Sequence, residues 1–196
     1  MTAIFPVLAL VGLGAFLFQV SGEHPEKAWQ AYLVNFILWS AVAQGGLLFS
    51  VVLHVTKARW GKPLQGLAES FVAFFPVSFL LFLVLFLGRA FVFPWIGGDL
   101  HGKEGWLTLP FLFSRDAAGL LILYGLGFAY LRCSLILKRS GSEMLEDRRE
   151  AVMSRMTIIA VLYIMAYALV LSLLAFDLIM SADPQCISTL FAPYGF

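Results

Sequence analysis

The chain of 196 residues is 61% hydrophobic, 15% aromatic and 13% charged, with a formal net charge of +1. Soluble proteins carry about 25% charged residues, so this composition excludes an ordinary soluble domain. The small net charge gives no sign of a nucleic-acid partner. We therefore expect an all-α, polytopic membrane protein.

Five apolar runs approach the length of about 20 residues that a helix needs to cross a bilayer. The predicted transmembrane helices are residues 3–20, 30–55, 67–88, 117–137 and 156–180. The first run lacks a basic stretch before it and a small-residue cleavage site after it. We therefore expect residues 1–28 to hold a retained helix and its outer loop, not a signal peptide.

Polar side chains follow one side of the second span. Within an arc of about 120°, at roughly 100° per residue, lie Ser40, Gln44, Ser50 and His54. Two interpretations remain for this polar seam: a packing surface for sister helices, or part of a path for protons or ions.

The third span opens with Glu69 and closes at Arg89, and Pro76 predicts a kink because proline lacks a backbone donor. The two charged residues are separated by roughly 30 Å of helix, so they lie at opposite membrane interfaces and cannot pair. Residues 89–116 are rich in Gly, Pro and Trp and predict an outer loop along the membrane surface.

Charged residues flank the fourth span. Arg115 and Asp116 precede it, and residues 138–155 after it predict a solvated cytoplasmic hairpin of helices. On the fifth span, Tyr163, Tyr167 and Asp177 share an arc of roughly 80°. Residues 182–196 then form an outer segment that begins a further helix.

The positive-inside rule orients the spans. The loops after spans two and four contain eight basic residues, whereas the loops after spans one and three contain four. The N-terminus, His54 and Glu69 are therefore predicted on the cytoplasmic side, and Asp177 on the outer side.

Ligands for redox cofactors are scarce in this chain. A haem between two histidines needs both at one depth, but only His54 lies in a span, and His24 and His101 lie in outer loops. The two cysteines, Cys133 in a span and Cys186 in a loop, are too few for an iron–sulfur cluster and too far apart in depth for a disulfide. We expect no metal and no redox cofactor to be bound by this chain.

Isolated ionisable groups at the two membrane rims are the candidate functional residues. An acid near the rim of a span is costly, which makes Asp177 a functional candidate by default. With Tyr163 and Tyr167 it forms either a proton relay or a static hydrogen-bonded cluster. Glu69 near His54 is either a proton access point or a plain interfacial acid.

Arg89 either extends to lipid headgroups or pairs with Asp177 or Asp116. The proton-pathway candidates are thus Asp177, Tyr163, Tyr167, Glu69, His54 and Gln44. Because the seam of the second span has too few polar groups to connect roughly 30 Å of hydrocarbon, we expect two half-pathways separated by a dry middle.

Three stretches of the chain resemble one family of membrane subunits: AWQAYLVNFILWSAVAQGGLLFSVVLHVTKARW, PFLFSRDAAGLLILYGLGFAYLRCSL and LAFDLIMSADPQCISTLF. They are similar to the ActF family, the second of the two NrfD-like (polysulfide-reductase membrane-subunit-like) subunits of bacterial alternative complex III. Its most specific element here is the Ser-x-Asp-Pro motif that contains Asp183. The chain reads Gln185-Cys186 where the family usually has His-Trp.

The resemblance implies that spans two to five form a four-helix bundle in the bacterial inner (cytoplasmic) membrane. It implies a complex that oxidises menaquinol or ubiquinol and passes electrons to cytochrome c or a terminal oxidase. The implied partners are the sister NrfD-like subunit, subunits that carry iron–sulfur clusters and haem c, and phospholipids. Family members are longer than this chain, which stops where a further span should begin.

Within such a complex, Asp177 with Arg89 or Tyr167 forms a candidate quinol site, and anchoring of the redox subunits is the other role that we consider. A small transporter or ion channel is the alternative function, suggested by the same polar seam. Against a transporter, the sequence shows no internal repeat and predicts no helix interrupted at mid-depth.

Overall fold

The computed structural model describes residues 4–93, 108–140 and 145–179, and its regular elements in these ranges are all helical. Four helical segments there are long and apolar enough to cross a membrane: Pro25–Val55, Lys62–Leu87, Leu109–Ser140 and Glu146–Leu178. The prediction of an all-α, polytopic membrane protein is confirmed.

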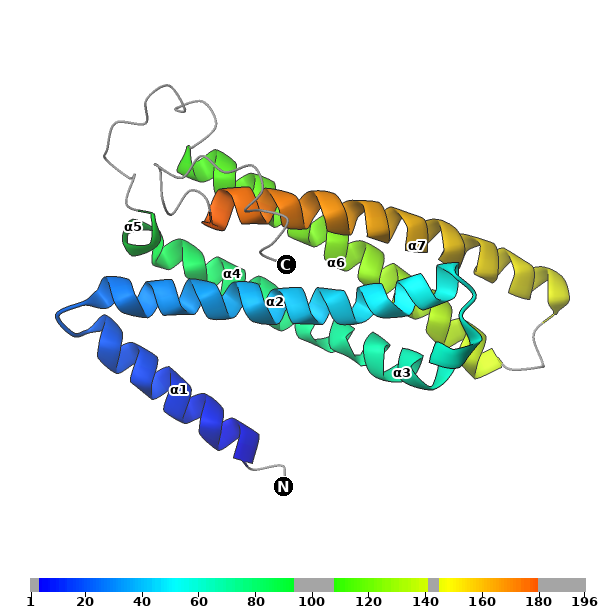
Figure 1. Cartoon of the computed structure of the whole chain (residues 1–196), viewed down its shortest axis with the longest axis horizontal. Helices are drawn as coiled ribbons and strands as arrows, with labels where there is room; N and C mark the ends of the chain where they lie inside the picture. Colours follow the sequence, from blue (N-terminus) through cyan, green and yellow to red (C-terminus); the bar gives the residue numbers. More distant parts are fainter. Residues whose placement is uncertain (1–3, 94–107, 141–144, 180–196) are drawn as a thin grey trace.

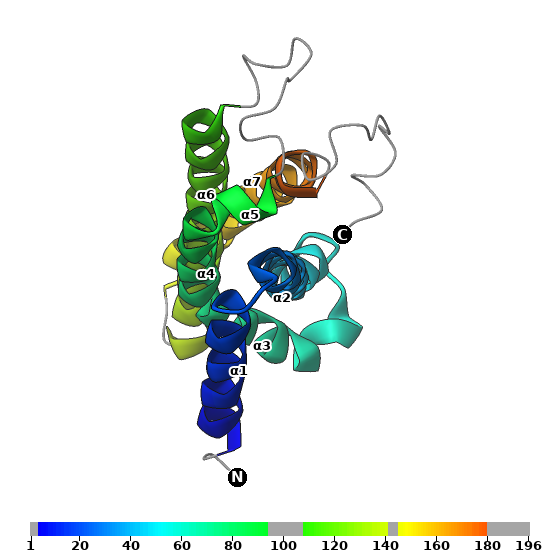
Figure 2. The same ribbon diagram turned by 90° about the vertical axis from the view of Figure 1, so that its left-hand side faces the viewer.

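Helices α2 (Pro25–Val55), α4 (Phe75–Leu87), α6 (Leu109–Ser140) and α7 (Glu146–Leu174) form a four-helix bundle (Figure 1). Helix α2 packs against α4 and α7, and α6 packs against the same two helices. The four helices therefore surround one axis, as the end-on view in Figure 2 shows. This is the bundle that the family resemblance implied for spans two to five.

Helix α1 (Ile4–Val20) lies outside the bundle and packs against the start of α2 (Figures 1 and 2). Its Phe16 ring lies 5.3 Å from the Trp29 ring and 5.4 Å from the Tyr32 ring, between centroids. With 17 residues it is shorter than the other four predicted spans. Its Leu10 and Phe18 side chains remain exposed, so much of its surface is open to lipid or to another protein.

The third span changes its helical form along its length. After a short turn, η1 (Arg59–Gly61), it consists of α3 (Lys62–Ser70), the 3-10 turn η2 (Phe71–Phe74) and α4. Pro76 has no N–H to donate to the Val72 carbonyl, and just before it the Phe75 N–H makes a tighter bond to that same carbonyl. The predicted kink is thus a short 3-10 turn within a helical segment that continues from Lys62 to Leu87.

Several boundaries differ from the predicted ones. Helix α6 begins at Leu109, so Arg115 and Asp116 lie inside a helix and not in the loop before it. The short helix α5 (Arg89–Val92) occupies the start of the predicted loop. The predictions for His101, Asp183 and Cys186 lie outside the described residues.

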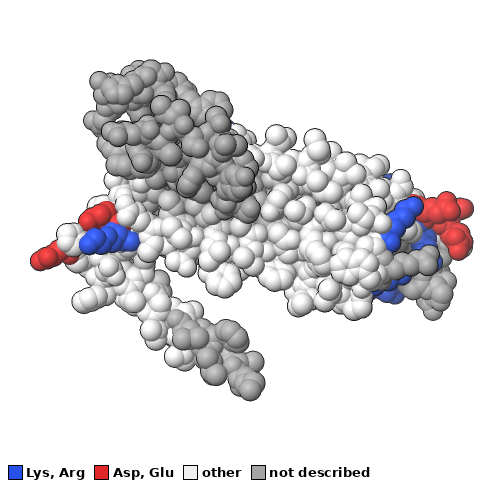
Figure 3. Space-filling view, viewed as in Figure 1, with Lys and Arg blue, Asp and Glu red and all other residues white. Residues whose placement is uncertain are grey.

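The surface of the bundle is apolar along most of its length. Large side chains such as Leu80, Leu121 and Met165 are exposed on three different helices. On the face that Figure 3 shows, the described Lys, Arg, Asp and Glu side chains gather at the two ends of the molecule, and the described surface between them is uncharged. Lipid is as apolar as these side chains, so helix association depends on close packing and on buried polar contacts instead.

Helix α6 packs closely against two neighbours where it crosses the interior. A Cβ atom on Gly127 would lie 2.6 Å from Cε2 of Phe75 and 2.9 Å from Cδ2 of Leu47. The Phe75 ring is fully buried and stacks on Tyr124 with 4.6 Å between centroids, so it cannot move aside easily. Gly127 therefore allows α2, α4 and α6 to approach one another.

We expect Gly127→Ala to destabilise the bundle by about 1–3 kcal/mol, the usual cost of overpacking a filled interior. Thermal unfolding of the purified protein in detergent measures the effect. Gly125→Ala on the same helix is the matched control, because a Cβ there meets nothing within 4 Å. Equal melting temperatures for the two variants would contradict the close approach at Gly127.

Candidate functional site

Three groups of buried polar side chains lie along the bundle, each drawing on more than one helix. The Asp177 cluster consists of Arg115, Asp116 and Asp177. The Gln44 cluster consists of Ser40, Gln44, Ser78, Tyr124 and Tyr163. The Glu69 cluster consists of Ser50, Glu69, Tyr130, Ser134 and Lys138.

An ion pair in the Asp177 cluster joins the start of α6 to the end of α7. Arg115 donates to Oδ2 of Asp177 from Nε, at 2.9 Å, and also from Nη2. Asp177 is 1% exposed and lies in η3 (Ala175–Ile179), a π-helical turn that continues α7. Such turns insert one extra residue into a helix and occur frequently at functional sites.

Asp116 is a second buried carboxyl in this cluster. It is 2% exposed and interacts electrostatically with both Asp177 and Arg115. Its carboxyl group lies close enough to that of Asp177 for the two acids to interact directly. One guanidinium balances one carboxylate, so two acids and one arginine are together neutral only when they hold one proton. Among the described residues, the Asp177 cluster therefore has one more acid than cations.

The Glu69 cluster lies at the opposite end of the bundle. Glu69 is 4% exposed and accepts hydrogen bonds from Nζ of Lys138 at 2.8 Å, Oγ of Ser134 at 2.7 Å and Oγ of Ser50 at 3.4 Å. The Tyr130 hydroxyl donates to the Ser50 carbonyl at 3.2 Å. The Lys138 side chain is 45% exposed, so the cluster connects a buried carboxylate with the surface of the molecule.

His54 lies beside the Glu69 cluster without binding Glu69 directly. Its Nε2 lies 3.2 Å from Oγ1 of Thr157, and its ring meets the Tyr130 ring edge-on with 6.0 Å between centroids. The structure therefore places the two predicted residues in one neighbourhood, with Tyr130 between them.

The Gln44 cluster makes the middle of the bundle polar. The Ser40 and Ser78 hydroxyls lie 2.5 Å apart, and the Tyr124 hydroxyl donates to Oγ of Ser78 at 2.8 Å. The Tyr163 hydroxyl donates to the backbone carbonyl of Gln44 at 3.2 Å. The Gln44 side chain is fully buried, and its amide lies near the Tyr124 hydroxyl. Hydrogen-bonding capacity is therefore available at mid-depth.

The spacing of the clusters matches the thickness of a bilayer. Helix α6 contributes Asp116, Tyr124 and Ser134 to the three clusters in turn, and its rise from Asp116 to Ser134 is about 27 Å against a hydrocarbon core of roughly 30 Å. Fully buried apolar side chains lie between the clusters, Leu120 on α6 and Leu47 on α2 among them. Because a hydrogen bond spans only about 3 Å, these two apolar layers interrupt the chain of polar groups.

The structure separates Asp177 from the two tyrosines that share its side of α7. Tyr163 and Asp177 are fourteen residues apart, which corresponds to about 21 Å of helix. The two residues therefore share one face of the helix but lie at different depths in the membrane. Tyr163 belongs instead to the Gln44 cluster, and its ring lies 6.4 Å from the Tyr167 ring.

Arg89 is not the arginine that binds Asp177. Its Nη1 donates to the Phe86 carbonyl at 3.3 Å, and its guanidinium lies 4.4 Å from the centroid of the Phe86 ring. The arginine that pairs with Asp177 is Arg115. The described contacts do not bring the quinol candidates Asp177, Arg89 and Tyr167 together.

Helix α6 supplies most of the site residues that sequence reasoning missed. The polar residues of its inward face, Asp116, Tyr124, Tyr130, Ser134 and Lys138, share an arc of about 120° at 100° per residue. A helical projection of the fourth span would have found this stripe. Ser78 carries no such signal, because it is a single serine in an apolar run.

No protein-family model and no curated protein sequence matches this chain. Within the described ranges, no three His, Cys, Asp or Glu side chains gather as ligands for a metal ion. The three polar clusters are therefore the features of the described residues from which a function can be inferred.

We expect Arg115→Gln to destabilise the protein by about 3–5 kcal/mol, because it leaves two buried acids without their cation. Arg89→Gln is the matched control and should have little effect. Unfolding of the purified protein by a denaturing detergent measures both. Adding Asp177→Asn to Arg115→Gln should restore part of the loss, and equal losses in the two single variants would contradict the ion pair.

Proposed function

We propose that this chain is an integral membrane subunit of a quinol-oxidising respiratory complex, which anchors redox subunits and carries protons part of the way across the membrane. Its membrane location follows from the four spanning helices. The type of complex is supported by the resemblance of three stretches to NrfD-like subunits of alternative complex III. The proton role is supported by the buried polar clusters.

One observation carries the proton role: each end of the bundle holds a buried acid that is paired with a cation of α6. Asp177 pairs with Arg115 at one end, and Glu69 pairs with Lys138 at the other. Charged groups inside a membrane protein are costly and mark proton or ion pathways by default. Carboxyl and hydroxyl groups both donate and accept protons, so the residues of all three clusters are suited to the task.

The three clusters act as successive proton-binding sites along one pathway. The Gln44 cluster divides the predicted dry middle into two apolar layers, one on each side of it. Proton transfer from one cluster to the next requires water or a side-chain movement at Leu120 and at Leu47. With the orientation given by the positive-inside rule, the Glu69 cluster faces the cytoplasm and the Asp177 cluster faces the outer side.

The electrons of quinol pass to iron–sulfur clusters and haem c in the partner subunits, with menaquinone or ubiquinone as the quinone. This chain contributes anchorage and protons to that reaction, and electron transfer to cytochrome c or to an oxidase takes place outside it.

Purification of the tagged chain from its native membrane in mild detergent should bring down subunits that contain iron–sulfur clusters and haem c. Absorption spectra and mass spectrometry of the purified material identify them. A chain that purifies alone and colourless would contradict the proposed complex.

In the assembled complex, we expect Asp177→Asn and Glu69→Gln to lower the number of protons moved per quinol while electron transfer continues. Proton release and quinol oxidation are measured separately on the same vesicles. Glu150→Gln is the control, because this acid is exposed at the start of α7. Unchanged proton stoichiometry in both cluster variants would make the acids packing groups only.

A transporter is the second candidate, and the buried polar side chains of α2, Ser40, Gln44 and Ser50, are the observation in its favour. Polar side chains inside a membrane protein mark substrate and ion pathways as well as proton pathways. Flux of a solute or ion through liposomes that contain only this chain would support it. Absence of flux, together with co-purified redox subunits, would favour the respiratory complex.

A further inference from the structure

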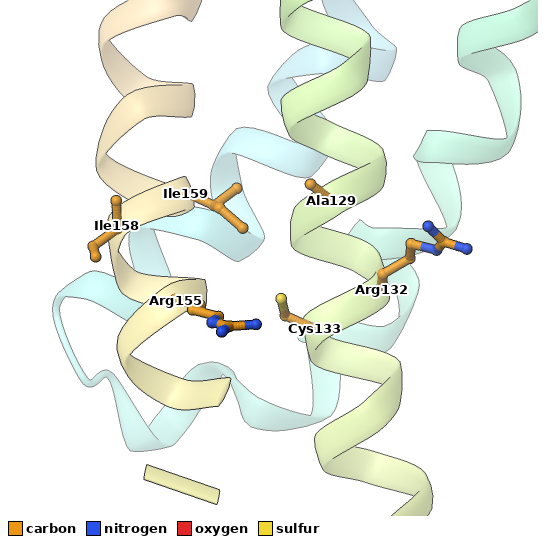
Figure 4. Close-up of a pocket in the computed structure, with 6 residues that line it drawn as sticks. All are labelled: Ala129, Arg132, Cys133, Arg155, Ile158 and Ile159. Atoms are coloured by element: carbon orange, nitrogen blue, oxygen red, sulfur yellow. The ribbon is translucent and has the colours of Figure 1, made fainter. Parts of the chain in front are cut away.

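A groove of about 360 Å³ lies between α6 and α7, apart from the three polar clusters (Figure 4). It is lined by Ala129, Arg132 and Cys133 of α6 and by Arg155, Ile158 and Ile159 of α7. Arg155 and Ile158 are exposed, so the groove opens on the outer surface of the bundle.

The groove combines one positive charge with an apolar floor. The Arg155 side chain points across the groove toward Cys133, whereas the Arg132 head group extends on the other side of α6 (Figure 4). Among the described ion pairs, none involves Arg155. Its guanidinium therefore lies beside apolar side chains without a carboxylate from the described protein to balance it.

The depth of the groove suits the boundary between lipid headgroups and hydrocarbon. Arg155 lies nine residues after Glu146, the first residue of α7, which is about 13 Å of helix. Each headgroup layer is about 5–8 Å thick. Because Glu146 is charged and starts the helix in water beyond that layer, Arg155 lies close to the boundary with the hydrocarbon. Ile158 lies one turn further into the bilayer.

We propose that this groove binds an anionic phospholipid, with the Arg155 guanidinium on the lipid phosphate and an acyl chain against Ile158 and Ile159. Basic pockets between transmembrane helices bind anionic headgroups, and the planar fork of arginine matches the oxygens of a phosphate. The apolar floor favours a lipid over free phosphate, which would gain nothing from it. The site is independent of the proposed respiratory function.

The test uses the full chain, purified in mild detergent and incubated with equal amounts of phosphatidylglycerol and phosphatidylcholine that have identical acyl chains. Native mass spectrometry counts the lipids that each protein molecule retains. We expect phosphatidylglycerol to be preferred, and Arg155→Gln to weaken its retention about tenfold, the usual effect of losing a hydrogen bond to a charged group.

Two matched controls separate the groove from general surface charge. Arg148→Gln removes an exposed cation of the same helix outside the groove, and it should keep the preference. Ala129→Leu fills the groove without changing charge and should lower retention, whereas Ala118→Leu on the exposed face of α6 should not. Equal binding of the two lipids, equal losses in Arg148→Gln and Arg155→Gln, or displacement of the lipid by an equal concentration of inorganic phosphate would overturn the proposal.

Discussion

A polar side chain inside a bilayer has no water to bond, so it must find its partner on a neighbouring helix. This constraint organises the described bundle. Arg115 ties α6 to the end of α7, Lys138 ties α6 to α3, and the Ser40–Ser78 contact ties α2 to α4. Hydrophobic burial does little to select one arrangement of the helices, because the lipid-facing and inward-facing side chains are both apolar. The buried polar contacts therefore select the rotation and depth at which the helices meet.

Helix α6 is the element that connects the structural and functional proposals. It contributes a cation to each terminal cluster and a tyrosine to the middle one. Its Gly127 lets α2 and α4 approach closely, which brings the Gln44 cluster together at mid-depth. The opposite side of the same helix lines the groove that we assign to an anionic lipid. The inward face of α6 thus contributes to the three polar clusters, and its outward face contributes to the proposed lipid site.

The 3-10 turn in the third span shows why a regular helical projection fails locally. Its buried residues Glu69, Val72, Phe75 and Ser78 recur every three residues across the 3-10 turn η2. A 3-10 helix has about three residues per turn, whereas a projection at 3.6 residues per turn places Glu69 and Ser78 on opposite sides. Pro76 in the sequence predicts that the helix is kinked. The form of the kink depends on how α2 and α6 pack against it.

The sequence by itself determined the class of protein, the order of the four long helices and the candidate acids Asp177 and Glu69. These are local properties, because apolar length and the position of a charge within a span can be read from one segment. Only the tertiary structure decided the partners. Arg115 binds Asp177 in place of Arg89, and Glu69 pairs with Lys138, a residue that the sequence did not single out. Partner choice depends on the relative depth and rotation of two helices, and no single segment of the chain contains that information.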